Sequence, residues 1–511
     1  MASAATHLEN GLLRSEPSRP DRGYRRVLLE YGLLSSFLFT LAVWLFTHGY
    51  HNELAVRSWT KILGVLDAPQ TRLEYLSLAY PHLPLYLLIP FRYLPGLDTP
   101  LAPVILAVLL VSGLLVYWYR QLAKGALHQP YRILALGFLL ANPFILWSST
   151  SSGAHALAFV LYYILCVSMA RLVITHDIRS FMLLGCTMAL LFFADERTPF
   201  LVIAVAPLLP LLLPPVILQR RAASAYLVIF LPVIFSVLGW IYLNWMFFRE
   251  PWQWLTLPDS AFRGAWAEIM SYTWLRDHGG QFFRPLVLAS GFAALLVPWL
   301  IGLLCSLRPM TPQWRACLVM TVVPIIATAL ATADSFLAHP FLMLFLLVPA
   351  MMAALASWPQ ITNRRPVLLI AGLGLSAVLS WGSMFWFSSP DFANWTSALS
   401  GQTIPPDREA DERLGAWLAA HRDPTLLDSR LAAWVIAARG DAQGLRLQFT
   451  REFRLNLLGQ LTAPQLVIPD PTTGLGASDL LNRRYPTLFA QGWPGYRLLY
   501  YDAPWRVYHR D

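Results

Sequence analysis

The chain has 511 residues, of which 56% are hydrophobic and only 13% are charged. Because an ordinary soluble domain is about 25% charged, this composition excludes a soluble enzyme, a disordered protein and a nucleic-acid binder. The formal net charge is +9, and the four cysteines lie in apolar runs, which is typical of free thiols rather than a disulfide framework. We therefore expect a multi-pass membrane protein.

Eleven apolar segments predict membrane helices, since a helix needs about 20 apolar residues to cross a bilayer. The segments are 28–47, 101–118, 131–147, 154–174, 180–194, 198–217, 225–247, 286–305, 316–332, 339–357 and 366–388. The fifth is short and runs directly into the sixth as a hairpin. The polar residues 1–27 carry five arginines and no cleavage signal follows them, so they predict a cytoplasmic tail.

Positive charge predicts the orientation, because short cytoplasmic loops are enriched in Lys and Arg. With the N-terminus inside, every cytoplasmic turn is at least doubly basic: Arg120, Lys124 and Arg132; Arg171 and Arg179; Arg220 and Arg221; Arg308 and Arg315; Arg364 and Arg365. The outer face then carries loops 48–100, 148–153, 195–197, 249–285 and 333–338 and everything after 388. A span at 83–94 would reverse the later loops, so we predict a surface or re-entrant helix there.

From residue 389 the composition becomes mixed, which predicts a small periplasmic α/β domain over 389–511. The residue pattern predicts helices at 409–421 and 431–438 and strands at 426–428, 445–449, 465–468, 496–501 and 505–509. The last two strands are joined through Asp502-Ala503-Pro504 and predict a hairpin. The fold class is therefore an all-α polytopic membrane protein (tail 1–27, transmembrane domain 28–388) with a small C-terminal α/β domain.

Ionisable residues gather at the predicted outer ends of the spans. Glu53 lies six residues beyond the first span, in a loop rich in histidines and aromatic residues. A carboxylate at a dry interface has a raised pKa and can act as a general base. The alternative is a solvated acid that pairs with Arg57 one helical turn later.

Thr198-Pro199 and His339-Pro340 place proline in a predicted first helical turn, where its missing N–H costs nothing. The positive dipole ends of both helices then face the outer interface, and Arg197 adds a fixed charge beside one of them. This arrangement can hold a phosphate. The alternative is that Arg197 pairs with Asp195 or Glu196 and that the proline only begins a helix.

The sequence contains no Gly-rich phosphate loop, no nucleophile elbow and no nucleotide fingerprint. His48 and His51 are neighbours on a helical spacing, but no acid or third histidine has the spacing of a metal site. We therefore expect no cofactor and no divalent metal.

The layout resembles the GT-C superfamily of membrane glycosyltransferases, in particular the branch of bacterial protein mannosyltransferases and lipid A aminoarabinose transferases. Asn52-Glu53 stands where the family has an Asp-Glu pair. Residues 81–88 (PHLPLYLL) resemble the family's His-Pro-Pro-Leu-Tyr box, and residues 244–251 resemble an Asn…Phe-Gly-Asp-Pro stretch. The ending 492–510 (GWPGYRLLYYDAPWRVYHR) resembles the closing hairpin of many bacterial members.

The resemblance implies that a sugar passes from a polyprenyl-phosphate carrier to an envelope acceptor on the outer face of the bacterial inner membrane. Glu53 would be the catalytic base, and Asn52 and His82 would orient the acceptor. Arg197 and His339 would hold the leaving phosphate. The remaining substrate-binding residues that we expect are Asp195, Glu196, His155 and Arg57. The expected partners are the lipid-linked donor and membrane lipids.

A second hypothesis is a weak or inactive GT-C-like subunit, whose domain 389–511 docks an envelope-assembly partner. Asn52 cannot accept a proton, and His155 stands where the family often has a second acid. A third hypothesis, a transporter, is disfavoured because few intramembrane charges line a pathway and no pair of interrupted spans suggests inverted repeats.

Overall fold

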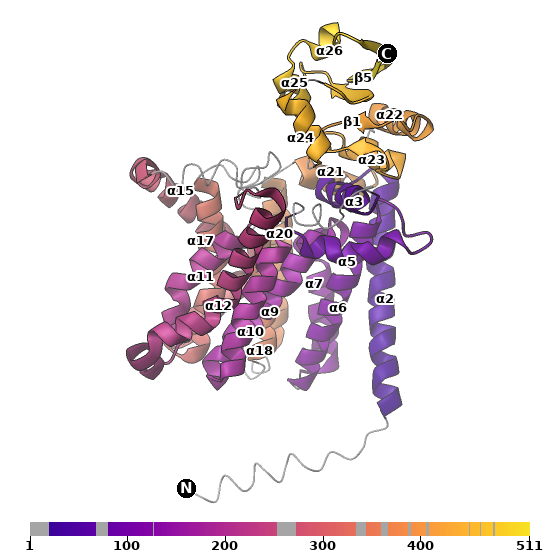
Figure 1. The fold of residues 1–511 in the computed structure, drawn as a ribbon. Coiled ribbons are helices and arrows are strands. Elements are labelled where there is room, and N and C mark those ends of the chain that lie inside the picture. The colour runs from indigo at the N-terminus through magenta and orange to yellow at the C-terminus, as the bar shows by residue number, and fades with distance from the viewer. Residues whose placement is uncertain are drawn as a thin grey trace, which may run out of the picture.

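The computed structural model describes residues 20–67, 80–125, 127–252, 272–333, 344–358, 366–386, 390–404, 408–448, 450–459, 461–473 and 476–511. Within this part of the chain, long helices stand side by side in one bundle, and a small sheet domain lies over one end of it (Figure 1). The N-terminal end of helix α2 (Pro20–Thr47) lies at the opposite end of the bundle.

The bundle consists of α2 and a series of helices of unequal length. They are α6 (Ala102–Lys124), α7 (Gln129–Leu140), α8 (Pro143–Thr150), α9 (Gly153–Thr175), α10 (Ile178–Ala194), α11 (Thr198–Leu212), α12 (Pro215–Phe248), α15 (Tyr272–Leu296), α16 (Pro298–Ser306), α17 (Pro312–Ala333), α18 (Leu347–Ser357) and α20 (Pro366–Trp386). Helix α9 is central, because it packs against α6, α10, α17 and α18.

Six of the described helices are long and apolar enough to cross a membrane: α2, α6, α9, α12, α17 and α20. The number rises to 8 if the bent pairs α7–α8 (65°) and α15–α16 (93°) each form one span. Shorter apolar helices occupy the positions of the other predicted segments, namely α10, α11 and a helix that ends at Ser357. The chain is therefore a multi-pass helical protein with 6 to 8 candidate spans, and helix length alone does not establish the predicted count of eleven.

Polar side chains cap the helices where the chain turns. Asn142 accepts a hydrogen bond from the Phe144 amide at the start of α8, and Ser152 and Asp177 cap α9 and α10 in the same way. A capping oxygen satisfies one of the backbone N–H groups that a helix start leaves without a partner. Pro199 lies in the first turn of α11, as the sequence predicts.

The C-terminal domain contains the predicted sheet, in the order β2-β1-β3-β5-β4. The strands are β1 (Thr425–Leu426), β2 (Leu445–Arg446), β3 (Gln465–Pro469), β4 (Tyr496–Asp502) and β5 (Trp505–Arg510). Strands β2, β1 and β3 run parallel, and β5 pairs antiparallel with both β3 and β4. The predicted hairpin is confirmed, with Asp502 opposite Trp505. The first two strands are shorter than the predicted 426–428 and 445–449.

Helices flank the sheet and connect its strands. They are α22 (Glu409–Ala420), α23 (Ala433–Arg439), α24 (Arg451–Leu458), α25 (Leu480–Arg484) and α26 (Leu488–Gln491), with a 3₁₀ turn at Gly476–Ser478. The first two correspond to the predicted helices at 409–421 and 431–438, and the last three were not predicted. Helix α21 (Pro390–Leu399), also not predicted, packs against α2 of the bundle.

Two short helices lie between the bundle and the sheet domain (Figure 1). Helix α5 (Leu83–Arg92) is the helix predicted at 83–94, and α3 (Glu53–Leu66) was not predicted. Helix α3 packs against α5 and α6 on one side and against α23 on the other. Its buried residues include Trp59, Ile62 and Leu63, which share one hydrophobic cluster with residues of the sheet domain. Helix α3 is therefore the element that joins the two parts.

An ion-pair network fixes the end of α3. Arg92 lies 3.1 Å from the Asp67 carboxylate, which also accepts a hydrogen bond of 3.0 Å from the Ala442 amide of the sheet domain. Because Asp67 is largely buried, these contacts are stronger than those of an exposed pair. They hold the sheet domain above the outer loops that the sequence predicts to be functional.

Candidate functional site

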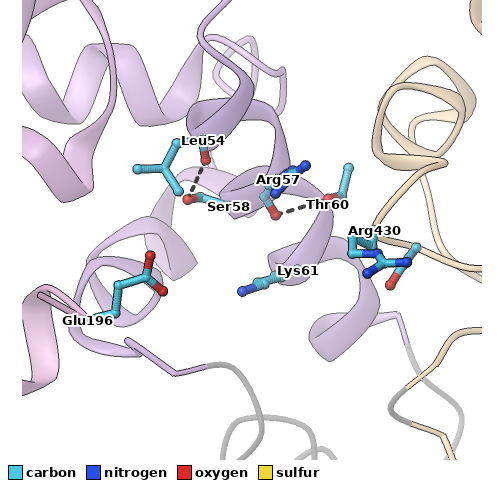
Figure 2. Close-up of a pocket in the computed structure, with 8 residues that line it drawn as sticks. Leu54, Arg57, Ser58, Thr60, Lys61, Glu196 and Arg430 are labelled. Carbon is cyan, nitrogen blue, oxygen red and sulfur yellow. Dashed lines mark hydrogen bonds between the residues drawn. The ribbon is translucent and has the colours of Figure 1, made fainter. Parts of the chain in front are cut away.

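The candidate site is a cavity of about 100 Å³ between α3, the turn that joins α10 to α11, and the sheet domain. Helix α3 contributes Arg57 and Lys61, and the turn contributes Glu196. The loop after β1 contributes Ser429 and Arg430. Figure 2 shows Lys61 and Glu196 pointing toward each other from opposite sides of the cavity, with Arg430 beyond Lys61. Three segments distant in sequence thus meet at one charged opening.

Helix α3 carries its two cations on one face because Arg57 and Lys61 are four residues apart. The buried residues Trp59, Ile62 and Leu63 fix the helix from below. The Arg57 Nε is buried and has no hydrogen-bond partner among the described residues. The Lys61 ammonium forms no ion pair within the described part of the chain. An anion in the cavity would therefore find donor groups that are not already used.

Glu53, the predicted base, begins α3 but does not line this cavity. Its side chain is 60% exposed, and its carboxylate accepts a hydrogen bond of 2.6 Å from Arg57 Nη2. This is the exposed i, i+4 pair that the sequence left as the alternative. Such a pair holds Arg57 in place and contributes about 0.3–0.5 kcal/mol to stability.

Glu196 is the half-buried carboxylate of the site. Burial, and next the neighbouring Asp195 carboxylate, raise its pKa from 4.5 to about 7. Lys61, Arg197 and Arg57 oppose this shift by favouring the charged form. A carboxyl group with a pKa near neutrality can both accept and return a proton at physiological pH. The sequence placed Glu196 among the substrate-binding residues, but only its surroundings show this property.

Asp195 and Arg197 form a buried, two-pronged ion pair next to Glu196. Arg197 Nε lies 2.8 Å from Asp195 Oδ1, and Nη2 lies 2.5 Å from Oδ2. Burial alone would raise the pKa of Asp195, but the Arg197 guanidinium outweighs it and holds that pKa below its usual value. Arg197 Nη1 is buried without a hydrogen-bond partner among the described residues. Arg197 thus has one donor group left for a ligand.

His155 lies behind this ion pair, close enough to interact electrostatically with both of its members. Its ring packs 4.5 Å from Trp147, and Nδ1 is 3.3 Å from the Ser151 hydroxyl. The imidazole is 6% exposed and lies at the start of α9, inside the bundle. It therefore supports the turn from behind and does not line the cavity.

His82 lies at the start of α5 in a group of aromatic rings. Its imidazole stacks on Trp240 at 4.4 Å and contacts Phe193 at 4.6 Å. Burial lowers its pKa from 6.5 to about 4, so the ring is neutral at pH 7. Nδ1 has no hydrogen-bond partner among the described residues. Tyr80 of the same group interacts electrostatically with Glu196 and Asp195, which connects these rings to the site.

Asn52 has a different neighbour, the carboxylate of Asp391 at the start of α21. Its side-chain amide donates to both Asp391 oxygens, at 3.2 and 3.3 Å, and its Oδ1 caps α3 by accepting from the Ala55 amide. Tyr50 and Trp147 also donate to Asp391, at 3.3 and 3.0 Å. Burial raises the pKa of Asp391, although these donors oppose the shift. The sequence did not single out Asp391, and its only local signal is an acid after Pro390 at a helix start.

The predicted site residues therefore divide into groups. Arg57 and Glu196 line the cavity, and Asp195, Arg197 and His155 lie together behind it. Glu53 and Asn52 lie at the start of α3 and do not line the cavity, and His339 lies outside the described residues. Within the described residues, no group of three or more His, Cys, Asp or Glu side chains is arranged to hold a metal ion.

No protein-family model matches this chain, and a search of curated proteins finds no significant match.

Proposed function

We propose that the protein is a GT-C-like membrane glycosyltransferase. In this proposal it has about eleven spans in a bacterial inner membrane, with its N-terminus in the cytoplasm and its C-terminal domain in the periplasm. It transfers a sugar from a polyprenyl-phosphate carrier to an envelope acceptor. The observation that carries the proposal is the cavity lined by Arg57, Lys61 and Glu196, in which the Lys61 ammonium faces Glu196, at the end of an apolar helical bundle.

The cations are suited to the phosphate of the donor. Arg57 retains an unpaired buried Nε, and the Lys61 ammonium faces the cavity without an ion pair in the described part of the chain. Positive groups that are already in place stabilise the negative charge that develops on a departing phosphate. Arg197 Nη1 is a further donor if the leaving group extends toward the turn. Helix α11 begins at Thr198, so its positive end lies beside the same turn.

Glu196 is the carboxylate best placed to act as the base. In the transfer, the acceptor oxygen forms a bond to the anomeric carbon while the bond from that carbon to the phosphate oxygen breaks. The electron pair of the broken bond leaves with the polyprenyl phosphate, and the acceptor proton passes to Glu196. Glu53, which the resemblance implies as the base, remains a prediction; its exposed pairing with Arg57 favours a positioning role.

The test is sugar transfer by the purified full-length protein in proteoliposomes, supplied with a panel of polyprenyl-phosphate sugars. The measured product is free polyprenyl phosphate. Glu196→Gln should lower the rate by about 10²–10⁴-fold, the usual contribution of a positioned base. Glu53→Gln should retain most of the activity. Glu409→Gln is the matched control, because Glu409 forms a similar exposed i, i+4 pair with Arg413 in the sheet domain.

The opposite pattern assigns the base to Glu53: loss in Glu53→Gln and retention in Glu196→Gln. If both variants transfer sugar as the unchanged protein does, neither carboxylate is the base. If the unchanged protein transfers no sugar from any carrier in the panel, the enzyme proposal fails.

The Asn52–Asp391 contact favours one alternative, a non-catalytic subunit. The position at which the family has an acid is occupied here by an amide whose donor and acceptor are both used structurally. Asn52→Asp would set two carboxylates against each other and should destabilise the fold, since like charges in one buried site cannot both ionise. The subunit hypothesis predicts no transfer by the unchanged protein and loss of envelope assembly when residues 389–511 are deleted.

A further inference from the structure

A second cavity lies far from the candidate site, in the half of the bundle opposite the sheet domain. It is an open groove of about 470 Å³ between α2, α6, α9 and α10. Its lining is almost entirely apolar and includes Tyr31, Gly113, Tyr117, Tyr163, Arg171 and Leu183. In Figure 1, α2 and α6 lie below α3 and α5, and α9 and α10 lie nearer the middle of the bundle. Three of these four helices, α2, α6 and α9, are candidate spans, so the groove lies within the proposed membrane region.

The length of the groove matches one leaflet of a bilayer. Along α9 it extends from Val160 to Arg171, which at 1.5 Å per residue is about 16 Å. Half of a hydrocarbon core of about 30 Å is about 15 Å. Arg171 lies four residues before the end of α9 at Thr175, so the basic end of the groove is at the membrane surface. One extended acyl chain therefore fits along it.

Two polar residues of the groove, Tyr163 and Arg171, lie eight residues apart on α9. The Tyr163 side chain is 2% exposed, and its hydroxyl has no hydrogen-bond partner among the described residues. The hydroxyl interacts electrostatically with the Arg171 guanidinium. Arg171 forms no ion pair within the part of the chain that the structure describes. An unpartnered buried hydroxyl costs about 1–3 kcal/mol, and this cost favours a ligand that supplies an acceptor.

We propose that the groove binds one acyl chain of an anionic membrane phospholipid, whose phosphate pairs with Arg171 and whose ester oxygen accepts from Tyr163. The apolar lining takes the chain, and Arg171, the one charged residue that lines the groove within the described part of the chain, selects a negative headgroup. A polyprenyl phosphate offers the same chemistry. The phospholipid is favoured because the groove is one leaflet long and lies in the half of the bundle away from Glu196.

The test is native mass spectrometry of the full-length protein titrated with phosphatidylglycerol or with phosphatidylcholine of the same chains. The unchanged protein should bind phosphatidylglycerol more tightly. Arg171→Gln should lower the affinity for phosphatidylglycerol about five-fold, which corresponds to about 1 kcal/mol for one basic residue near a membrane surface. The same variant should leave the affinity for phosphatidylcholine unchanged. Tyr163→Phe should lower the affinity for both lipids equally, because both carry the ester oxygen that accepts from Tyr163.

Gly113→Phe tests the groove itself. A Cβ at Gly113 meets only the Tyr31 ring, at 3.8 Å, so a phenyl group there enters the groove and should abolish binding of both lipids. Gly32→Phe on α2 is the matched control, because a Cβ at Gly32 meets nothing within 4 Å and this residue does not line the groove. It should bind both lipids as the unchanged protein does.

Three results would overturn the proposal. The first is equal affinity of the unchanged protein for the two phospholipids. The second is full phosphatidylglycerol binding in Arg171→Gln or in a folded Gly113→Phe. The third is displacement of phosphatidylglycerol by a lower concentration of polyprenyl phosphate, which would make the groove a carrier site. None of these results depends on whether the protein transfers sugar.

Discussion

The buried pair of Asp195 and Arg197 gives the sharpest prediction, because its geometry sets how much stability is lost when one partner is removed. The two side chains are 9% and 7% exposed and share hydrogen bonds of 2.5 to 3.1 Å. Among the described residues, Arg197→Met leaves the buried Asp195 carboxylate with the backbone N–H of residue 197 as its one hydrogen-bond donor. Removing one partner of a buried ion pair costs about 3–5 kcal/mol. The double variant Asp195→Asn, Arg197→Met removes both charges. It should lose less stability than Arg197→Met alone.

The measurement is the free energy of unfolding in mixed detergent micelles, for the unchanged protein, the two single variants and the double variant. The coupling energy from this cycle should be about 2–3 kcal/mol. The exposed pair of Glu53 and Arg57, treated in the same way, should give about 0.3–0.5 kcal/mol. A coupling energy of Asp195 and Arg197 no larger than that of the exposed pair would show that the turn is hydrated, and it would contradict a buried ion pair.

Glu196→Gln should stabilise the protein more at pH 8 than at pH 4. The pKa of Glu196 is about 7 in the folded protein and 4.5 ordinarily. Glu196 therefore ionises first in the unfolded chain, and stability falls as pH rises between the two values. Denaturation at both pH values tests this. If Glu196 is the base, transfer should rise about ten-fold between pH 6 and pH 8 in a pH profile, and a flat profile would contradict that role. Asp391→Asn places an amide against the donors of Asn52, Tyr50 and Trp147 and should cost about 2–3 kcal/mol in the same denaturation assay; a loss below 0.5 kcal/mol would contradict the buried contact. One-sided membrane reporters fused at 125, 222 and 511 should agree at the first two positions and differ at the third. Disagreement between the first two, or agreement of the third with them, would contradict the proposed topology.

The local pattern of the sequence was sufficient to predict the helical bundle and the closing hairpin. Each of the eleven apolar segments contains an apolar helix, and strands β4 and β5 begin where alternation and the Asp502-Ala503-Pro504 turn place them. These features depend on hydrophobic periodicity and turn chemistry within a few residues of one another. Helix α3 was predictable in principle as well, since Asn52 is a good N-cap and Trp59, Ile62 and Leu63 have helical spacing.

The chemistry of the site depended on contacts between distant segments, which no local pattern contains. Asn52 meets Asp391 across 339 positions of the chain. Lys61 of α3 and Glu196 of the turn between α10 and α11 face each other across one cavity. The sequence by itself determined which segments form apolar helices, because hydrophobic periodicity is a local property of the chain. Only the tertiary structure decided which charges are buried, paired or left facing a cavity, because desolvation and Coulomb energies depend on distance in space and not on position in the chain.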